Sequence, residues 1–332
     1  MNSHPKRRKL FHVLKSQQFD RALLDELYQI TNKVRRVAKS KEGSNYLRRI
    51  LSHKRAMLYF VQPSTRTFLS FLNACQILGM QTSDIRDTTT SSEVKGESIY
   101  DTIRTFCSYV DVVIMRYPEA GFTEEIAHYL DTTPRPVPII NGGSGPDQHP
   151  TQALLDIYTL QESFKDSDGI DGKTIAMVGD LKRGRTARSL TYLLKNYKDV
   201  KLIFVAPKEF QMMNDIKRFC RRVGMPYVEA EHLESVIPEA DAIYMTRIQD
   251  EYDSNDESKH IDHSAFHFKH EFLKLLKPAG IIMHPFPRRD EIDVSVDSDP
   301  RAKYWRQERN GMWTRVSILV KIFEVEDKIM SL

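Results

Sequence analysis

Residues 174–186 read TIAMVGDLKRGRT and contain the clearest indication of the fold class. The first five residues form an apolar run of strand length, and a turn with Gly179 and Gly184 separates this run from a helical segment. Alternation of buried strands with amphipathic helices is typical of parallel sheets covered by helices. The pattern therefore predicts an α/β fold.

The same alternation continues along the chain. Phe68, Phe71, Leu72, Cys75 and Leu78 recur at helical spacing and so share one helix face. A chain of 332 residues is long enough for two domains. The sequence thus predicts two doubly wound domains, each a mostly parallel sheet covered by helices, with the active site in the cleft between them. The other predicted strands are 56–61, 111–115, 137–140, 201–205, 241–245 and 280–283.

Composition limits the classes of function. Hydrophobic residues make up 40% and charged residues 28%, which excludes collagen-like, low-complexity and wholly disordered chains. The net charge of +4 is too small for a nucleic-acid footprint, and no apolar run approaches the roughly 20 residues that cross a bilayer. Three cysteines without a CxxC pair favour neither a disulfide framework nor a cysteine zinc site. We therefore expect a cytoplasmic protein without nucleic-acid or membrane partners. Residues 1–10 are expected to form a solvated basic tail, with a targeting signal or an anion-binding arm as the alternatives.

The segment 62–67, QPSTRT, lies between a predicted strand and a predicted helix. Ser64 or Thr65 can cap this helix, whose first backbone N–H groups are suited to an anion such as phosphate. Arg66 adds a fork of donors that suits the same ligand. A well-capped helix without any ligand explains these residues equally well, so this segment alone leaves both interpretations open.

Other candidate ligand-binding segments follow strands or turns. A neutral His149, close to Gln152, can donate to a carbonyl oxygen, although a lone histidine is more often structural. The spacing of 179–186 nearly matches a P-loop, but Arg185 stands where lysine is required, which argues against nucleotide hydrolysis and favours a carboxylate ligand. Segments 245–249 (MTRIQ) and 284–288 (HPFPR) follow two other strands, where ligands of open α/β sheets bind.

Together these segments resemble the aspartate/ornithine carbamoyltransferase family, and within it the aspartate branch. The resemblance runs from about residue 10 to the end of the chain. It implies a carbamoyl-phosphate-binding domain over 1–148, to which a C-terminal helix near 306–332 returns, and an aspartate-binding domain over 149–305. The segments that carry it are 63–67 (PSTRT), 95–97 (KGE), 115–116 (MR), 149–152 (HPTQ), 179–182 (GDLK), 184–186 (GRT), 245–249 (MTRIQ) and 284–288 (HPFPR).

The resemblance implies transfer of the carbamoyl group of carbamoyl phosphate to L-aspartate, giving N-carbamoyl-L-aspartate and phosphate in pyrimidine biosynthesis. It implies no metal and no cofactor. The chemistry is then positioning of the substrates and stabilisation of developing charge. The residues implied for carbamoyl phosphate are Ser64, Thr65, Arg66, Thr67, Arg116, His149 and Gln152, of which Arg66, Thr67, Arg116 and His149 are the catalytic ones.

For the acceptor, the resemblance implies that Arg185 binds the α-carboxylate of aspartate. Ser91 and Lys95 match a loop that enters the active site of the neighbouring subunit. A homotrimer with shared active sites is therefore implied, and a regulatory partner or larger assembly is left open. The other residues implied for aspartate are Arg247 and Gln249, on the side-chain carboxylate, with Pro285 and Phe286.

Two positions depart from the pattern of the family. Gln62 stands where the family has Glu, and Tyr252 stands where it has the Arg of Lys-Glu-Arg. In the family these two charged groups meet when the domains close. Their paired replacement leaves two alternatives open: a carbamoyltransferase for another amine, or a non-catalytic paralogue that binds carbamoyl phosphate.

A group of histidines suggests a further alternative. Their spacing could align them on one helix face, as a metal site requires. Exposed histidines on a helix are common, however, and we predict no metal site. The group consists of His260, His263, His267 and His270.

Overall fold

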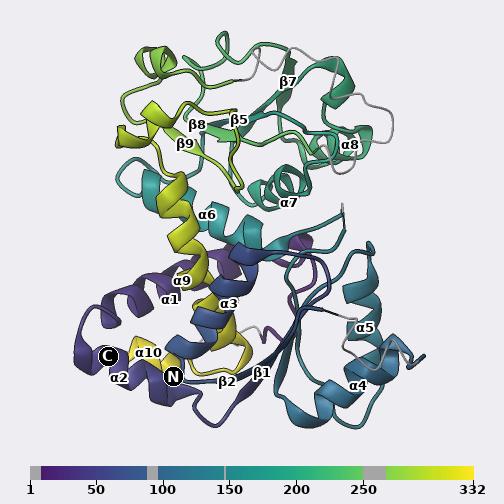
Figure 1. Cartoon of the computed structure of the whole chain (residues 1–332). Coiled ribbons are helices and arrows are strands. Elements are labelled where there is room, and N and C mark those ends of the chain that lie inside the picture. The colour runs from purple at the N-terminus through teal and green to yellow at the C-terminus, as the bar shows by residue number, and fades with distance from the viewer. Residues whose placement is uncertain (1–8, 88–95, 146, 250–266) are drawn as a thin grey trace, which may run out of the picture. The chain divides into compact units, whose positions relative to one another are not determined.

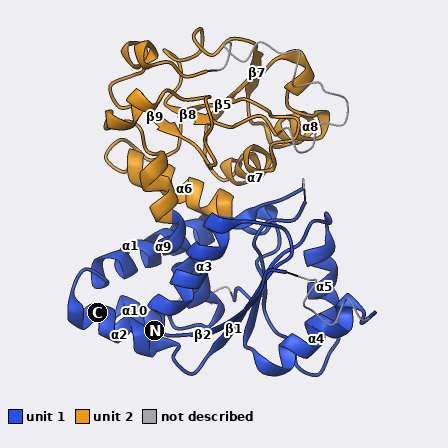
Figure 2. Cartoon of the chain, in the orientation of Figure 1, with its two compact units in different colours: residues 1–151, 311–332 blue, residues 152–310 orange. Residues whose placement is uncertain are grey.

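The computed structural model describes residues 9–87, 96–145, 147–249 and 267–332 (Figure 1). The chain divides into two compact units (Figure 2). Unit 1 contains Met1–Thr151 and Gly311–Leu332, and unit 2 contains Gln152–Asn310. Each unit has its own parallel sheet covered by helices, which confirms the predicted fold class.

Unit 1 is built on a four-stranded sheet in the order β2-β1-β3-β4. Its strands are β1 (Arg55–Phe60), β2 (Gln81–Ile85), β3 (Val112–Arg116) and β4 (Ile139–Asn141). Every pairing in this sheet is parallel, and β1 pairs with β3 in a register that sets Ala56 opposite Val112. The strand order reverses between β1 and β3, so the loops that follow these strands meet at a topological switch point.

Helices cover both faces of this sheet. Tyr59 and Met115 point to the face that packs on α4 (Ile99–Tyr109) and α5 (Phe122–Asp131). On the other face, Phe60 packs edge-on against Phe68 of α3 (Thr65–Ile77). The layers are visible in Figure 1, where α3 lies on one side of the strands and α4 and α5 lie on the other.

The C-terminal residues of the chain pack on the first helices of unit 1. Lys321 near the end of α9 (Tyr304–Ile322) is buried and pairs with Glu26 of α1 (Arg21–Val37) and with Glu326 of α10 (Glu326–Met330). Arg315 of α9 donates to the hydroxyl of Ser70 on α3. The second half of α9 is therefore fastened to α1 and α3, while α2 (Lys41–Ile50) follows α1 in the chain.

Unit 2 contains a five-stranded parallel sheet in the order β7-β6-β5-β8-β9. The chain proceeds outward from β5 to β6 and β7, and then returns to the other side of β5. The switch point therefore lies between β5 and β8. The strands are β5 (Thr174–Val178), β6 (Lys201–Val205), β7 (Tyr227–Ala230), β8 (Ala242–Met245) and β9 (Ile281–Met283), and the helices include α6 (Pro150–Phe164), α7 (Arg185–Leu194) and α8 (Asn214–Val223).

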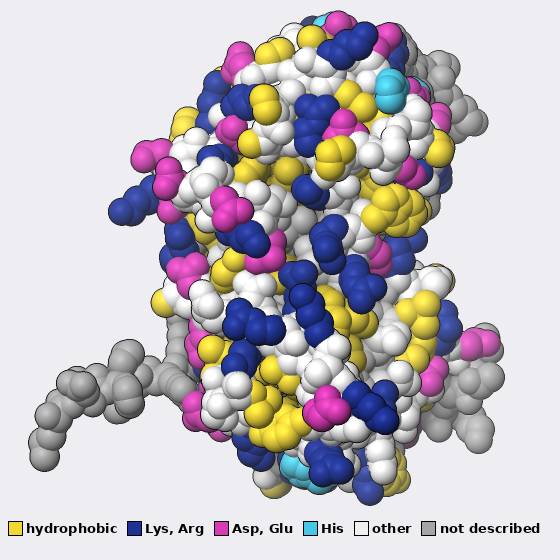
Figure 3. Space-filling model, turned by 90° about the vertical axis from the view of Figure 1, so that its left-hand side faces the viewer, with side chains coloured by type: hydrophobic (Ala, Val, Ile, Leu, Met, Phe, Trp, Pro, Cys, Tyr) yellow, Lys and Arg dark blue, Asp and Glu magenta, His cyan; other side chains and the backbone are white. Residues whose placement is uncertain are grey.

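The surface carries a mixture of charges. In Figure 3, Lys and Arg side chains lie among Asp, Glu and hydrophobic side chains on the face shown. Among the described residues, no helix has the length and apolar character needed to cross a bilayer.

Candidate active site

The helix α3 begins at the predicted anion-binding segment of unit 1. Ser64 occupies the N-cap position, but its side chain makes no capping hydrogen bond. In α1, α2 and α4 of this unit, the side chains of Asp20, Ser40 and Ser98 each accept a hydrogen bond from a first-turn N–H group. The helices α5 and α10 also start without a side-chain cap, but their N-cap residues Gly121 and Val325 carry no side-chain oxygen, whereas Ser64 does. The start of α3 thus lacks the side-chain cap that would compete with an anion, which favours the ligand-binding interpretation of this segment.

Four predicted residues lie at or near the carboxyl edge of the unit 1 sheet. Thr65 and Arg66 are exposed in the first turn of α3. Thr67 is buried in the same turn, and its Oγ1 lies 3.4 Å from Nε2 of His149, which directly precedes α6. A hydroxyl and an imidazole from two separate segments therefore converge beside an uncapped helix start.

Arg116 ends β3 and is largely buried beside His149. Its Nη1 donates to the carbonyl of Gly142 at 3.3 Å. Gly143 has a φ of 114°, and a Cβ at this position would lie 2.8 Å from the Arg116 Nη1 and 3.3 Å from the His149 ring. Glycine at this position therefore allows both side chains to approach the backbone.

Gln152 lies in the first turn of α6 and belongs to unit 2. Its Nε2 donates to Oδ1 of Asp156, one helical turn further along, at 2.9 Å. Both residues are buried. The contact defines the orientation of the Gln152 amide, since a carboxylate only accepts hydrogen bonds.

The loop after β5 is joined to the loop after β8 in unit 2. Asp180 is fully buried, and its carboxylate accepts from the backbone N–H of Arg183 at 3.1 Å and from that of Gln249 at 3.3 Å. Burial raises the pKa of Asp180 above its ordinary value, although these N–H groups oppose the shift. Asp180 therefore holds the segment before Arg185 against the segment that carries Arg247.

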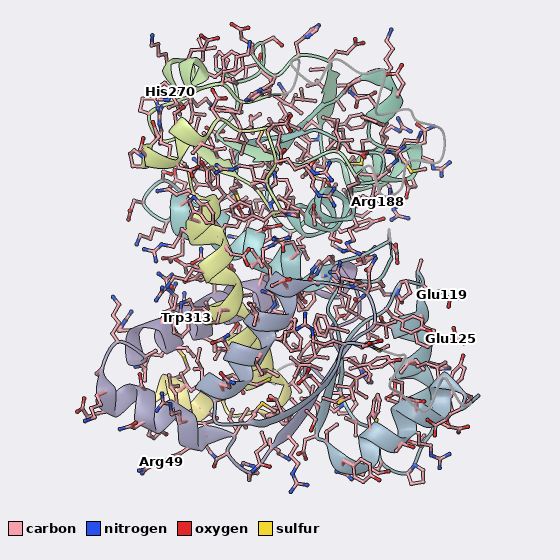
Figure 4. All side chains as sticks on the ribbon, in the orientation of Figure 1. Arg49, Glu119, Glu125, Arg188, His270 and Trp313 are labelled. Atoms are coloured by element: carbon pink, nitrogen blue, oxygen red, sulfur yellow. The ribbon has the colours of Figure 1, made fainter. Side chains whose placement is uncertain are left out.

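The two arginines predicted for the acceptor are half-buried at the ends of these loops. Arg185 is the first residue of α7. Arg247 lies two residues after β8, and its Nη1 donates to the carbonyl of Ile248 at 2.9 Å. Arg188, which is labelled in Figure 4, lies one turn beyond Arg185. Its guanidinium makes two hydrogen bonds to the Asp215 carboxylate.

The loop after β9 is held by buried hydrogen bonds around His284. Its Nδ1 accepts from the backbone N–H of Phe286 at 2.8 Å, so its Nε2 carries the proton and donates to Glu291 at 2.6 Å. Burial by itself raises the pKa of Glu291, but the hydrogen bonds from His284 and from the Arg289 backbone outweigh it, and the pKa lies below its ordinary value. Phe286 has a positive φ of 55° and precedes a cis peptide bond to Pro287. Pro285 and Phe286 are thus presented by a defined loop.

Some of the predicted residues lie outside the described residues, namely Ser91, Lys95, Tyr252, His260 and His263. The other two histidines of the proposed helical group do not share a helix. His267 precedes the short 3-10 helix His270–Lys274 and contacts the Asp293 carboxylate, whose second oxygen accepts from the backbone of His270. The part of the chain that the structure describes contains no group of three His, Cys, Asp or Glu residues that could hold a metal ion.

Sequence reasoning missed the residues that hold these loops. Asp180 lies in the segment 179–182 (GDLK), but nothing in the sequence indicated that its side chain bonds to two loops. Asp156 carried a weak signal, because it lies four residues after Gln152 and directly follows the apolar run 153–155. Gln307 carried no such signal, since its side-chain hydrogen bonds are with residues more than 20 positions away.

Two family models match the chain. Residues 11–162 match the carbamoyl-P binding domain of aspartate/ornithine carbamoyltransferases. Residues 171–322 match the Asp/Orn binding domain of the same proteins.

Individual relatives match over nearly the whole chain. It is 39% identical over 318 residues to the chloroplastic aspartate carbamoyltransferase of Arabidopsis thaliana, covering 95% of this chain and 78% of the relative. It is 39% identical over 302 residues to the aspartate carbamoyltransferase catalytic subunit of Methanocaldococcus jannaschii, covering 90% of this chain and 94% of the relative. A solved structure of aspartate transcarbamoylase from Trypanosoma cruzi with carbamoyl phosphate and aspartate has a TM-score of 0.84 and 34% identity, covering 95% of this chain and 97% of that chain.

Proposed function

The chain belongs to the aspartate/ornithine carbamoyltransferase family, and from this premise we propose that it transfers the carbamoyl group of carbamoyl phosphate to the amine of L-aspartate. The products are N-carbamoyl-L-aspartate and phosphate, and the reaction belongs to pyrimidine biosynthesis. The relatives and the solved structure named above, all aspartate carbamoyltransferases, support aspartate as the acceptor.

One observation of the structure carries the proposal. The helix α3 starts without a side-chain cap, and its first turn bears Arg66 and Thr67. The Thr67 Oγ1 lies 3.4 Å from Nε2 of His149. Backbone N–H groups, a guanidinium and a hydroxyl are together suited to the phosphate of carbamoyl phosphate. Ser64 and Thr65 complete this proposed phosphate site.

The proposed chemistry needs donors at the carbonyl oxygen of the carbamoyl group. The aspartate amine attacks the carbonyl carbon, a C–N bond forms, and the bond from that carbon to the phosphate oxygen then breaks. Negative charge develops on the carbonyl oxygen, where Thr67, Arg116 and His149 are the proposed donors. The departing phosphate takes the proton released by the amine, so the protein supplies position and charge rather than a covalent intermediate.

We assign the acceptor to unit 2. Arg185 is proposed to bind the α-carboxylate of aspartate, and Arg247 with Gln249 the side-chain carboxylate. Guanidinium groups bind carboxylates in a bidentate manner, and two such groups select a dicarboxylic amino acid. The Asp180 bonds to the two loops support this assignment, because they hold the arginine-bearing segments together.

The assembly and the compartment are also proposals. The family resemblance of Ser91 and Lys95 supports a homotrimer in which neighbouring chains share active sites. We retain a cytoplasmic location, although several plant relatives are named as chloroplastic.

Phosphate release tests the proposed reaction. We expect release of phosphate from carbamoyl phosphate that depends on an amine, with L-aspartate preferred over ornithine, other amino acids and the diamine putrescine. Arg66→Ala should reduce kcat/KM by about 30- to 1,000-fold, which corresponds to about 2–4 kcal/mol of lost transition-state stabilisation. Arg49→Ala, which removes an exposed guanidinium from α2, is the matched control and should leave activity unchanged. Carbamoyl phosphate binding without turnover for any amine would instead support the non-catalytic paralogue.

A further inference from the structure

A buried carboxylate lies at the centre of a hydrogen-bond network in unit 2. Oδ1 of Asp156 accepts from Nε2 of Gln152 at 2.9 Å and from Nε2 of Gln307 at 2.7 Å. Its Oδ2 accepts from the hydroxyl of Tyr244 at 2.8 Å. Asp156 is fully buried, and three different elements, α6, α9 and β8, thus donate to it.

The protonation of this network is set by its surroundings. Burial raises the pKa of the Tyr244 hydroxyl well above its ordinary value, and the charge of Asp156 raises it further. Tyr244 therefore remains a hydrogen-bond donor. With donors on both oxygens, the carboxylate form of Asp156 has a hydrogen-bonded environment that suits a buried charge.

The network determines which end of the Gln152 amide is available to a ligand. An amide has one accepting and one donating end, and only its NH2 end can bond to a carboxylate. Because Asp156 binds this end, the Oε1 of Gln152 is turned away from Asp156. An oxygen presented in this way accepts from an N–H group and does not donate to a carbonyl.

A second arm of the network reaches the loop after β9. Gln307 is oriented by the same Oδ1, so its own Oε1 accepts from the backbone N–H of His284 at 2.8 Å. His284 in turn holds the backbone of Phe286. One carboxylate thus sets the orientation of Gln152 and anchors the start of the 284–287 loop.

We propose that Asp156 is a positioning residue, whose carboxylate holds the Gln152 amide with its oxygen toward the NH2 group of carbamoyl phosphate. This inference rests on the proposed function, since it concerns how that substrate is recognised. It assigns Asp156 to selection of an acyl phosphate that carries an NH2 group on its carbonyl carbon, rather than to binding of the phosphate group.

Acetyl phosphate provides the discriminating probe, because a methyl group replaces the NH2 group of carbamoyl phosphate. Dissociation constants are measured for carbamoyl phosphate, acetyl phosphate and inorganic phosphate with the intact chain. We expect Asp156→Ala to weaken carbamoyl phosphate about tenfold while the other two ligands stay within twofold of the original protein. Equal weakening of all three ligands would reveal a purely structural role, and unchanged carbamoyl phosphate affinity would equally overturn the inference.

A double-mutant cycle tests whether Asp156 acts through Gln152. In a Gln152→Ala background, Asp156→Ala should change carbamoyl phosphate affinity by less than twofold. A further tenfold loss in that background would contradict the proposed route. Asp241→Ala is the matched control, because this carboxylate also accepts a backbone and a side-chain hydrogen bond but lies just before β8, at its amino end. It should leave the preference for carbamoyl over acetyl phosphate unchanged.

Two further measurements keep the test decisive. If Asp156→Ala does not fold, Asp156→Leu combined with Tyr244→Phe fills the space and removes one unpaired donor, and the same outcomes apply. Turnover of aspartate by the original protein tests the proposed function separately. A protein that turns over aspartate but binds carbamoyl and acetyl phosphate equally would overturn the inference alone, whereas absence of turnover would overturn the proposed function.

Discussion

Ser64, at the N-cap of α3, affects whether the first-turn N–H groups of this helix can bind an anion. It stands at the N-cap, but its own hydroxyl does not accept a hydrogen bond from the first-turn N–H groups. We predict that Ser64→Asp leaves the free energy of unfolding unchanged or raises it by up to about 1 kcal/mol, because an aspartate caps the helix and suits its dipole. The same carboxylate should weaken binding of inorganic phosphate at least tenfold by charge repulsion. Calorimetry of phosphate binding and denaturant unfolding measure the two effects.

Ser98→Asp supplies the matched control. Ser98 caps α4 with its side chain and lies elsewhere in unit 1. An added charge there should leave phosphate affinity unchanged, so a loss in both variants would attribute the effect to net charge rather than to the start of α3.

Gly143 is a second position at which one residue controls the site. We predict that Gly143→Ala lowers kcat/KM about 10- to 100-fold, because a Cβ 2.8 Å from the Arg116 Nη1 must displace that guanidinium and crowd the His149 ring. The unfavourable φ of 114° should also cost about 1–3 kcal/mol of stability. Steady-state kinetics together with thermal unfolding separate the two consequences.

Gly169→Ala controls for the backbone effect alone. Gly169 also has a positive φ, of 71°, but an added Cβ there meets nothing within 4 Å. This variant should lose about 1–2 kcal/mol of stability and retain full activity. Equal activity loss in both variants would show that global destabilisation, and not displacement of Arg116, is responsible.

At the level of elements, the sequence predicted the strands that are buried on both faces. The runs 174–178 and 201–205 coincide with β5 and β6. Two strands were missed, β2 with sequence QTSDI and β7 with sequence YVEA. Both are edge strands with largely exposed side chains, so hydrophobic periodicity, which reports burial, could not reveal them.

In the candidate site, too, features that depend on neighbouring residues could be predicted and features that depend on distant residues could not. The positions of Ser64, Thr67 and Arg185 at the starts of helices could be predicted, because strand-to-helix turns have a local signature. The residues that hold the loops could not, since Asp156 and Gln307 bond across 151 positions of sequence. Such contacts depend on tertiary packing, which no short segment of sequence encodes.

The loop after β9 leads to a pH prediction. The pKa of Glu291 in the folded protein lies below its ordinary value. Ionised Glu291 therefore stabilises the fold fully above about pH 5. This stabilisation is lost as the pH falls through the pKa of the unfolded chain, about 4.3, and then through the lower pKa of the folded protein. We predict that Glu291→Gln lowers the free energy of unfolding by about 1–2 kcal/mol near pH 7 and by less at pH 3.5. Denaturant unfolding across this range measures the difference.

Asp290→Asn is the control for this loop, since Asp290 is the exposed neighbour of Glu291. Its unfolding curve should keep the pH dependence of the original protein. A Glu291→Gln deficit that stays constant down to pH 3.5 would contradict the assigned role of the His284 contact.

On the scale of the whole molecule, the candidate site residues are divided between two units, each built on a parallel sheet. Each unit places its residues at the carboxyl edge of a parallel sheet, near the point where strand order reverses. Unit 1 supplies the uncapped helix start with Arg116 and His149, and unit 2 supplies the loops joined by Asp180. Under the proposed function, unit 1 would bind the phosphate of carbamoyl phosphate and unit 2 would bind the carboxylates of the acceptor.

The proposed homotrimer leads to a prediction about mixed assemblies. Sedimentation equilibrium should give a molecular mass of about three times the 38.6 kDa of one chain. Arg66→Ala and Lys95→Ala should each have strongly reduced activity alone. Mixing the two with subunit exchange should raise the activity above that of either variant, because some sites then combine an intact Arg66 with an intact Lys95 from the neighbour. A mixture of Arg66→Ala with Arg116→Ala should show no such rise, since both residues belong to unit 1 of one chain and every site keeps one defect. Exchange without recovery in the first mixture would show that Lys95 does not complete a neighbour's site.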